Sequence, residues 1–202
     1  MKTNKTPNSL QTKRNIAAST ESFLDYKEIL AQSVQYIDYK QLFADVSESP
    51  EDFSVVFKLM FDENEKVAWH AAWICEKVSE RSPHFFSEKA IEQIVTLAIS
   101  TAFTGLQRLL LSMVLNLGLP NEIPVDFINL SFERMISPKS PVAVQVLSMK
   151  ILYEFTKHEP DLKAELKVYL ESIDVENYTT GYKSARKNIL KKLQKEMRQR
   201  IE

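Results

Sequence analysis

A helical segment recurs along this chain at a spacing near forty residues. The clearest copy covers residues 64–80, and three more follow it. One position in each copy is taken as equivalent, namely Val67, Leu106, Val142 and Tyr182. The steps between these positions in the numbering are 39, 36 and 40. A repeat of this length, built from helix pairs, is typical of helical solenoids. The repeat therefore predicts an architecture and leaves the chemistry open.

The turn and strand signals favour an all-α chain. No Asn-Gly or Asp-Gly hairpin signal occurs, and no long stretch alternates with period two. Seven of the eight prolines fall between apolar periodic segments, where a helix begins or has ended. Ser49 and Pro50 predict an N-cap followed by a proline in the first turn, and Ser140 and Pro141 predict the same arrangement.

We expect about eight to ten helices in stacked antiparallel pairs. Their predicted ranges are 21–32, 38–46, 50–61, 64–80, 87–100, 105–117, 124–136, 140–157, 160–172 and 181–200. Residues 1–20 are polar and are predicted to be disordered. Residues 21–202 are predicted to form a single domain, with clear repeat pairs from about 50 to 200.

Composition and charge exclude several classes of protein. The net charge is −1, so no global basic field argues for nucleic acid. The single cysteine, Cys75, excludes an internal disulfide. No apolar run is long enough to span a membrane, and the N-terminus lacks the apolar region of a secretory signal. The cytoplasm is the expected compartment.

Two helical runs carry a resemblance to a known family. Residues 67–78, VAWHAAWICEKV, and residues 141–155, PVAVQVLSMKILYEF, resemble the second helix of HEAT or armadillo-type repeats. The resemblance covers about residues 50–200. It implies a right-handed α-α superhelix that acts as a non-enzymatic protein-interaction or scaffold module. The last copy departs from the pattern at Arg186, so its pair is either shifted by one residue or an atypical cap.

The second helix of each predicted pair is apolar over most of its surface, which requires neighbours on both sides. Its core positions are expected to be almost fully buried. In three copies these positions are Ala71, Ile74, Leu110, Met113, Val146 and Met149.

A stripe of residues at offsets +2, +6 and +10 follows the second helices. In HEAT-like proteins these helices line the concave surface, so the resemblance implies a binding stripe there. The first two copies supply the candidate partner-binding residues Trp69, Trp73, Lys77, Arg108, Ser112 and Asn116. The third and fourth copies place Val144, Ser148, Leu152, Ser184, Asn188 and Lys192 on the same stripe. Trp and Arg dominate binding hot spots; the alternative is that both tryptophans pack between adjacent repeats.

The C-terminal helix is strongly basic. From Gly181 onward there are eight Lys or Arg and two Glu, a local charge of +6. Its candidate binding residues are Lys183, Lys187, Lys191 and Lys195. Basic amphipathic helices bind acidic proteins, membranes or phosphates. The alternative is that the apolar side closes the solenoid and the basic side is simply solvated.

No catalytic constellation appears in the sequence. There is no Gly-rich phosphate loop, and Cys75 with His70 fits a core thiol beside an imidazole on a polar strip better than a metal site. We expect no metal and no cofactor.

The partner is expected to be another protein or a peptide. The alternative is a HEAT-like nucleic-acid-binding protein or a DNA glycosylase for alkylated bases, which would need aromatic residues and a carboxylate in a basic concave groove. A strongly positive concave face would favour nucleic acid, and a neutral or negative face a protein.

Overall fold

The computed structural model describes residues 25–199, and no β-strand occurs within that range. The chain divides into two compact units, the first ending at Val78 and the second beginning at Ser79. Each unit is described by itself. The predicted disordered tail lies outside the described residues, and a single domain over 21–202 stays a prediction.

Unit 1 is built from short helices around an aliphatic core. It contains a helical turn at 25–31, η1 (Val34–Tyr36), α2 (Tyr39–Glu48), α3 (Pro50–Leu59) and the part of α4 (Glu65–Arg81) that precedes Ser79. The helix α2 packs against α3. The residues buried most completely are Leu30, Val46, Val56, Leu59, Met60, Val67, Ala71, Ala72, Cys75 and Val78.

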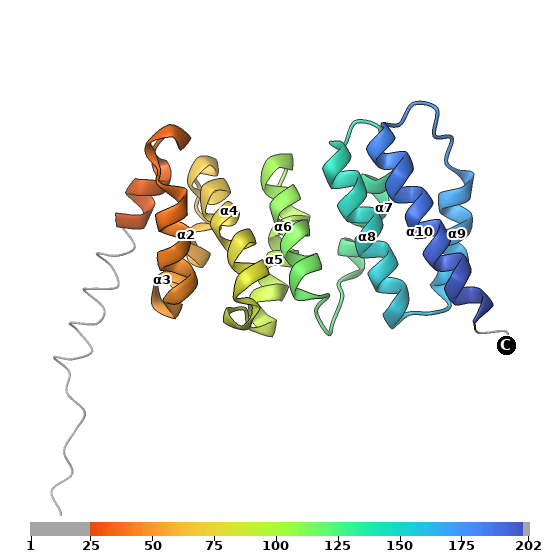
Figure 1. Ribbon diagram of the computed structural model, residues 1–202, viewed down its shortest axis with the longest axis horizontal. Coiled ribbons are helices and arrows are strands. Elements are labelled where there is room, and N and C mark those ends of the chain that lie inside the picture. The colour runs from red at the N-terminus through yellow and green to blue at the C-terminus, as the bar shows by residue number, and fades with distance from the viewer. Residues whose placement is uncertain (1–24, 200–202) are drawn as a thin grey trace, which may run out of the picture. The chain divides into compact units, whose positions relative to one another are not determined.

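Unit 2 consists of three helix pairs that follow one another along the chain. After η2 (Pro83–Phe85) come α5 (Glu88–Ser100) with α6 (Thr104–Leu117), α7 (Val125–Ile136) with α8 (Val142–His158), and α9 (Leu162–Ser172) with α10 (Thr180–Arg198). Within this unit α6 packs on α8 and α8 on α10, while α5 packs on α7. The second helices therefore form one layer and the first helices another (Figure 1).

The observed burial corrects the register of the third repeat. Val142, taken above as the equivalent of Val67, is 39% exposed, whereas Val144 is completely buried. Leu106 and Tyr182 are buried as expected. With Val144 as the equivalent position, the steps between repeats become 39, 38 and 38, which is more regular than the predicted spacing. The predicted register of that copy was wrong by two residues.

The predicted core is confirmed at five of its six positions. Ala71, Ile74, Leu110, Met113 and Met149 are all at most 2% exposed. Val146 is only half-buried, so its assignment to the core was wrong. The register error explains the failure, because Val146 lies two residues beyond the buried Val144 and faces another side of α8. The same error placed Val144, Ser148 and Leu152 on the binding stripe, although all three are buried.

Capping agrees with the sequence at one of the two predicted sites. Ser49 Oγ accepts a hydrogen bond of 3.1 Å from the Asp52 amide, and Pro50 is the first residue of α3. At α8 the N-cap is Pro141 itself, and no side chain caps the helix. The prediction that Ser140 acts like Ser49 was wrong.

Side chains of the second helices cap the carboxyl ends of the first helices in unit 2. Gln107 Nε2 donates to the Ala98 carbonyl of α5 at 3.0 Å. Gln145, one repeat later, donates to the Ser137 carbonyl at the end of α7 at 2.7 Å. The last carbonyls of a helix have no partner within the helix, so each bond satisfies a group that would otherwise be unpaired.

Arg186 performs the same role for α9. Its Nε donates to the Leu170 carbonyl at 2.6 Å and a terminal guanidinium nitrogen to the Glu171 carbonyl at 3.3 Å. In the corrected register, Arg186 occupies the position that Ser148 occupies one repeat earlier. The last copy is therefore in register and not shifted by one residue. Its Arg186 is a charged side chain that caps the carboxyl end of α9.

Candidate functional site

A groove of about 830 Å³ lies on the second-helix layer of unit 2. Its walls come from α8 and α10, with Leu115 contributed by α6. The lining residues are Leu115, Val146, Lys150, Tyr153, Glu154, Gly181, Ser184, Ala185, Asn188, Ile189 and Lys192. Within unit 2 this is the most spacious of the described hollows.

The corrected repeat register accounts for the polar part of this lining. Counted from Val144, offsets +2, +6 and +10 are Val146, Lys150 and Glu154. Counted from Tyr182, they are Ser184, Asn188 and Lys192. All six line the groove. The stripe inferred from the sequence is thus present on α10 as expected and on α8 after a shift of two residues.

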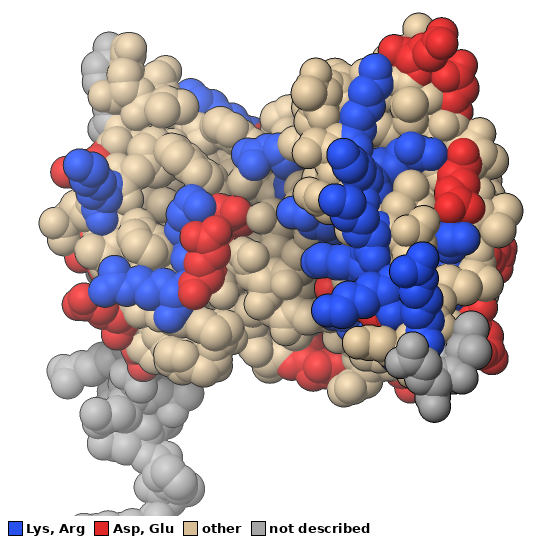
Figure 2. Space-filling view, turned by 45° about the vertical axis from the view of Figure 1, so that its right-hand side comes forward, with Lys and Arg blue, Asp and Glu red and all other residues tan. Residues whose placement is uncertain are grey.

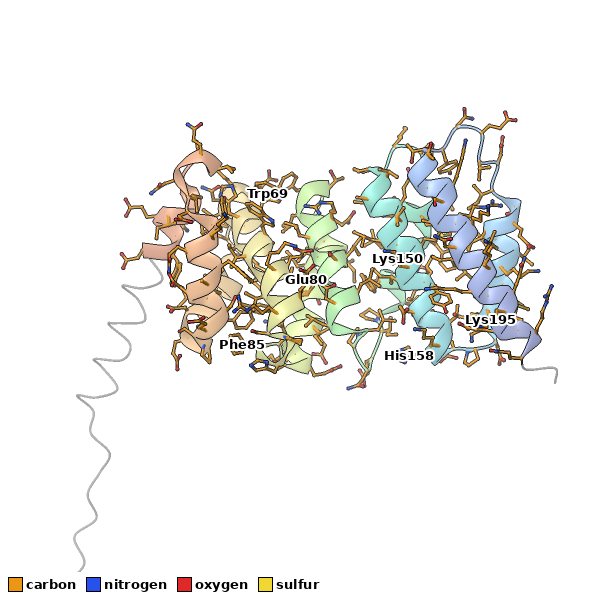
Figure 3. The ribbon with its side chains drawn as sticks, in the orientation of Figure 1. Trp69, Glu80, Phe85, Lys150, His158 and Lys195 are labelled. Carbon is orange, nitrogen blue, oxygen red and sulfur yellow. The ribbon has the colours of Figure 1, made fainter. Side chains whose placement is uncertain are left out.

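The groove is basic. Lys150 and Lys192 are exposed, and no carboxylate of the described residues forms a salt bridge with either. Glu154 is neutralised by Lys157, whose Nζ lies 2.5 Å from the carboxylate. Figure 2 shows Lys and Arg side chains gathered in a broad band over this part of unit 2, and Figure 3 shows Lys150 on α8 and Lys195 on α10.

Tyr153 forms a fixed element of the groove wall. Only 6% of it is exposed, and its hydroxyl donates to Glu196 Oε1. The Nζ atoms of Lys157 and Lys192 lie 5.4 and 5.2 Å from its ring centroid. Burial, followed by the hydrogen bond to Glu196, raises the pKa of Tyr153 to about 12, so the hydroxyl stays protonated at neutral pH.

Glu196 connects α10 to α9 beside this tyrosine. Burial alone would raise the pKa of its carboxyl, but hydrogen bonds from Lys163 and Tyr153 outweigh burial and hold that pKa below its usual value. The Lys163 Nζ lies 2.5 Å from Glu196 Oε2. The carboxylate is therefore ionised and already compensated, and it adds no free negative charge to the groove.

The candidate residues of the second copy lie on α6 outside the groove lining. Arg108 and Ser112 are half-buried and Asn116 is exposed. Asn116 Nδ2 donates to Ser79 Oγ at 2.9 Å, a bond within unit 2 that joins α6 to the last turns of α4. Asn116 therefore has a structural partner, and a binding role for these three residues stays a prediction.

The candidate residues of the first copy lie in unit 1. Trp69 and Trp73 are half-buried and their rings stack at 6.3 Å between centroids. Tyr39 packs against Trp73 at 4.3 Å. Lys77 is exposed and pairs with Glu76 at 3.1 Å. The two tryptophans form a partly exposed aromatic surface, and its role in partner binding stays a prediction.

His70 is buried, not on a polar strip as the sequence suggested. It is 1% exposed, and its Nδ1 lies 2.6 Å from the Leu30 carbonyl oxygen. The contact requires a proton on Nδ1, because a carbonyl oxygen is only an acceptor. Burial lowers the pKa of His70, although the bond to Leu30 opposes this. Cys75 is fully buried, and burial raises the pKa of its thiol, which fits the expected core thiol.

The four lysines singled out on the basic helix, Lys183, Lys187, Lys191 and Lys195, are exposed and lie outside the groove lining. Lys183 Nζ donates to the Glu176 carbonyl at 3.3 Å, a local contact before α10. The apolar side of α10 does pack into the unit, through the buried Tyr182, Ile189 and Leu193. Sequence reasoning missed Lys150 and Tyr153 of the groove, because the register of α8 decides which of its residues face it.

Two negative findings apply to the part of the chain that the structure describes. No group of three His, Cys, Asp or Glu side chains there could hold a metal ion. No helix among residues 25–199 is long and apolar enough to cross a membrane.

Comparison with known proteins identifies the fold family. The family model of the HEAT repeat domain matches residues 26–193. This chain belongs to the HEAT repeat domain family. No curated protein and no solved structure shows significant similarity to it. The match extends the HEAT assignment to residues before 50, where the sequence repeats were not visible, and the all-α fold of stacked helix pairs agrees with it. HEAT repeats are a kind of module that mediates protein interactions.

Proposed function

We propose that this HEAT repeat protein is a non-enzymatic interaction module that holds a segment of another protein in the groove between α8 and α10. The supporting observation is the groove itself, lined at the same three repeat offsets by two successive second helices. Its volume of about 830 Å³ is enough for several side chains of a bound segment. We keep the cytoplasm as the proposed compartment.

The groove has the mixed character of a recognition surface. Leu115, Val146, Ala185 and Ile189 give it apolar area, while Ser184 and Asn188 offer hydrogen-bonding groups. Protein segments that dock between two helices use apolar anchors for affinity and polar contacts for orientation. The neighbouring repeats hold the walls, so little ordering is needed on binding.

Site-specific photo-cross-linking tests this proposal. A benzophenone amino acid at Ser184, inside the groove, should produce a discrete adduct of defined mass in native cells. The matched control is the same amino acid at Val168, which is 64% exposed on the first-helix layer. Filling the groove with Asn188→Trp should abolish the Ser184 adduct. Equal adducts from Ser184 and Val168, or an adduct that survives Asn188→Trp, would contradict the proposal.

A nucleic-acid partner is the second candidate, because the groove and the adjoining face of α10 are positive (Figure 2). The positive charge of the groove does not by itself separate a protein from a nucleic-acid partner, since carboxylates and phosphates are both anions. A glycosylase site would also need a free carboxylate in the groove, and Glu154 is paired with Lys157. Gel-shift titration with single- and double-stranded oligonucleotides separates the two candidates.

A further inference from the structure

The lysines that line the groove indicate the sign of charge that a bound molecule would carry. Its two cations, Lys150 and Lys192, project from different helices and have no carboxylate partner among the described residues. The nearby acids Glu154 and Glu196 are both occupied by lysines outside the lining, at 2.5 Å each. An occupant that supplied negative charge between α8 and α10 would therefore meet two ammonium groups without a carboxylate partner, while the lysines paired with Glu154 and Glu196 offset the repulsion from those acids.

The remaining surface of the groove restricts the occupant further. Four of its lining residues, Leu115, Val146, Ala185 and Ile189, are aliphatic. An aliphatic floor between lysines is complementary to an apolar side chain flanked by acids. A phosphodiester backbone would leave that floor uncovered.

Nucleic acid is also disfavoured by the aromatic chemistry. Proteins that bind single strands stack bases on exposed aromatic rings and use arginine. The groove has no arginine, and its one aromatic residue, Tyr153, is only 6% exposed with its hydroxyl held by Glu196. The ring is thus unavailable for stacking.

The chain's own N-terminal segment does not fit the groove either. Residues 1–24 contain four Lys or Arg and one Glu, so they carry the same sign of charge as the groove. The occupant must therefore come from another molecule.

We propose that the groove between α8 and α10 binds an acidic peptide segment of another protein, with an apolar side chain on the aliphatic floor and carboxylates at Lys150 and Lys192. This inference rests on the proposed function and names the chemistry of its partner. Lys192 is held beside the Tyr153 ring, at 5.2 Å from its centroid, so one of the two cations is positioned before the partner arrives.

Selection from an unbiased library tests the proposal without a known partner. A display library of random twelve-residue peptides is selected on the full chain and, in parallel, on the double variant Lys150→Gln/Lys192→Gln. The wild-type chain should enrich sequences with net negative charge and at least one large apolar residue, and the variant should lose that enrichment. The matched control is Lys89→Gln/Lys139→Gln, which makes the same charge change at exposed residues of unit 2 outside the lining.

Affinities of an enriched peptide give the quantitative test. By fluorescence anisotropy, Lys150→Gln and Lys192→Gln should each weaken binding about two- to fivefold, the usual range for an exposed ion pair. Binding should weaken as salt rises, and replacement of all the peptide's acids by Gln should weaken it more than either lysine substitution does alone. An oligothymidylate of twelve nucleotides should bind more weakly than the peptide.

Each contrary result has a defined meaning. Neutral or basic enriched peptides, no enrichment over the groove variant, an equal effect of the control variant, or tighter binding of the oligothymidylate would each overturn the inference. If the Ser184 cross-link nevertheless persists and responds to Asn188→Trp, the groove is a binding site and only the partner chemistry is wrong. If that cross-link also fails, the proposed function fails with it.

Discussion

A single buried histidine should make the stability of unit 1 depend on pH. His70 is almost fully buried, with its Nδ1 against the Leu30 carbonyl, and burial lowers its pKa below the usual 6.5. Above pH 6.5 the imidazole is neutral in the folded and unfolded chains, so the contribution of His70 to the free energy of unfolding is fully present. As the pH falls below 6.5 the unfolded chain binds the proton first, and the free energy of unfolding decreases.

We therefore expect the urea midpoint to fall between pH 7.5 and pH 5, followed by tryptophan fluorescence. Trp69 reports this site, because its ring centroid lies 5.1 Å from that of His70. The control is His70→Asn, which keeps a donor for the Leu30 carbonyl and cannot titrate. The decrease should be smaller in this variant, and an identical decrease in both proteins would show that His70 is not responsible.

One glycine is required by its backbone conformation. Gly118 ends α6 with φ 95° and ψ 164°, a region that is essentially accessible to glycine alone. Gly118→Ala should destabilise the protein by about 1–3 kcal/mol, although a Cβ there would meet no atom within 4 Å.

Gly181→Ala is the matched control, because Gly181 is helical and its Cβ would meet Val142 at an ordinary 3.7 Å. It should be neutral or stabilising by about 0.5–1 kcal/mol. Urea denaturation of both variants checks the pair, and equal effects would refute the backbone argument.

At the scale of the helix pair, long polar side chains stabilise the ends of the first helices. Arg186 donates to the last carbonyls of α9, as Gln107 and Gln145 do for α5 and α7. Arg186→Met keeps most of the apolar stem and removes both bonds. It should cost about 1–3 kcal/mol, because the partly buried Leu170 carbonyl loses its donor.

Hydrogen exchange localises this effect. Amides in the last turn of α9, around Leu170, should exchange faster in Arg186→Met than in the wild-type chain. Lys187→Met, which changes an exposed neighbour on α10, is the control and should leave them unchanged. Uniform acceleration throughout unit 2 would mean that Arg186 contributes to global stability and not to the helix end.

The same elements show why the sequence predicted the helices better than the groove. Apolar periodicity and prolines predicted the helices and five of the six core residues. The spacing of apolar residues within one helix is enough to show which of its faces is buried. In α8 the run from Val142 to Val146 alternates valines, so several faces are equally apolar and only packing on the neighbouring helices α6, α7 and α10 selects one. A shift of two residues there moved Lys150 and Glu154 out of the predicted stripe.

The polar residues that cap the first helices could not be predicted for a different reason. Gln107, Gln145 and Arg186 look like solvent-exposed residues in sequence, and their partners are carbonyls of another helix. The corrected repeat spacing does bring Gln107 and Gln145 into equivalent positions. That coincidence is the sequence signal that could have found them.

At the scale of the whole molecule, the two units can be followed separately during unfolding. The chain's two tryptophans, Trp69 and Trp73, both lie in unit 1, whereas far-UV circular dichroism reports the helices of both units. The helix α4 runs across the boundary between Val78 and Ser79. Because a helix shared by two units loses part of its packing when either one unfolds, we expect a single transition in urea with coincident midpoints.

Leu110→Ala turns this expectation into a directional test. Leu110 is fully buried in α6 of unit 2, so its truncation should cost about 2–5 kcal/mol. If the predicted single domain over 21–202 is correct, the fluorescence midpoint of unit 1 should fall by as much as the dichroism midpoint. Ser184→Ala, an exposed change in the same unit, is the control and should move neither. If Leu110→Ala lowers the dichroism midpoint and leaves the fluorescence midpoint unchanged, the two units unfold independently. Energetic coupling between neighbouring repeats would then be confined to unit 2.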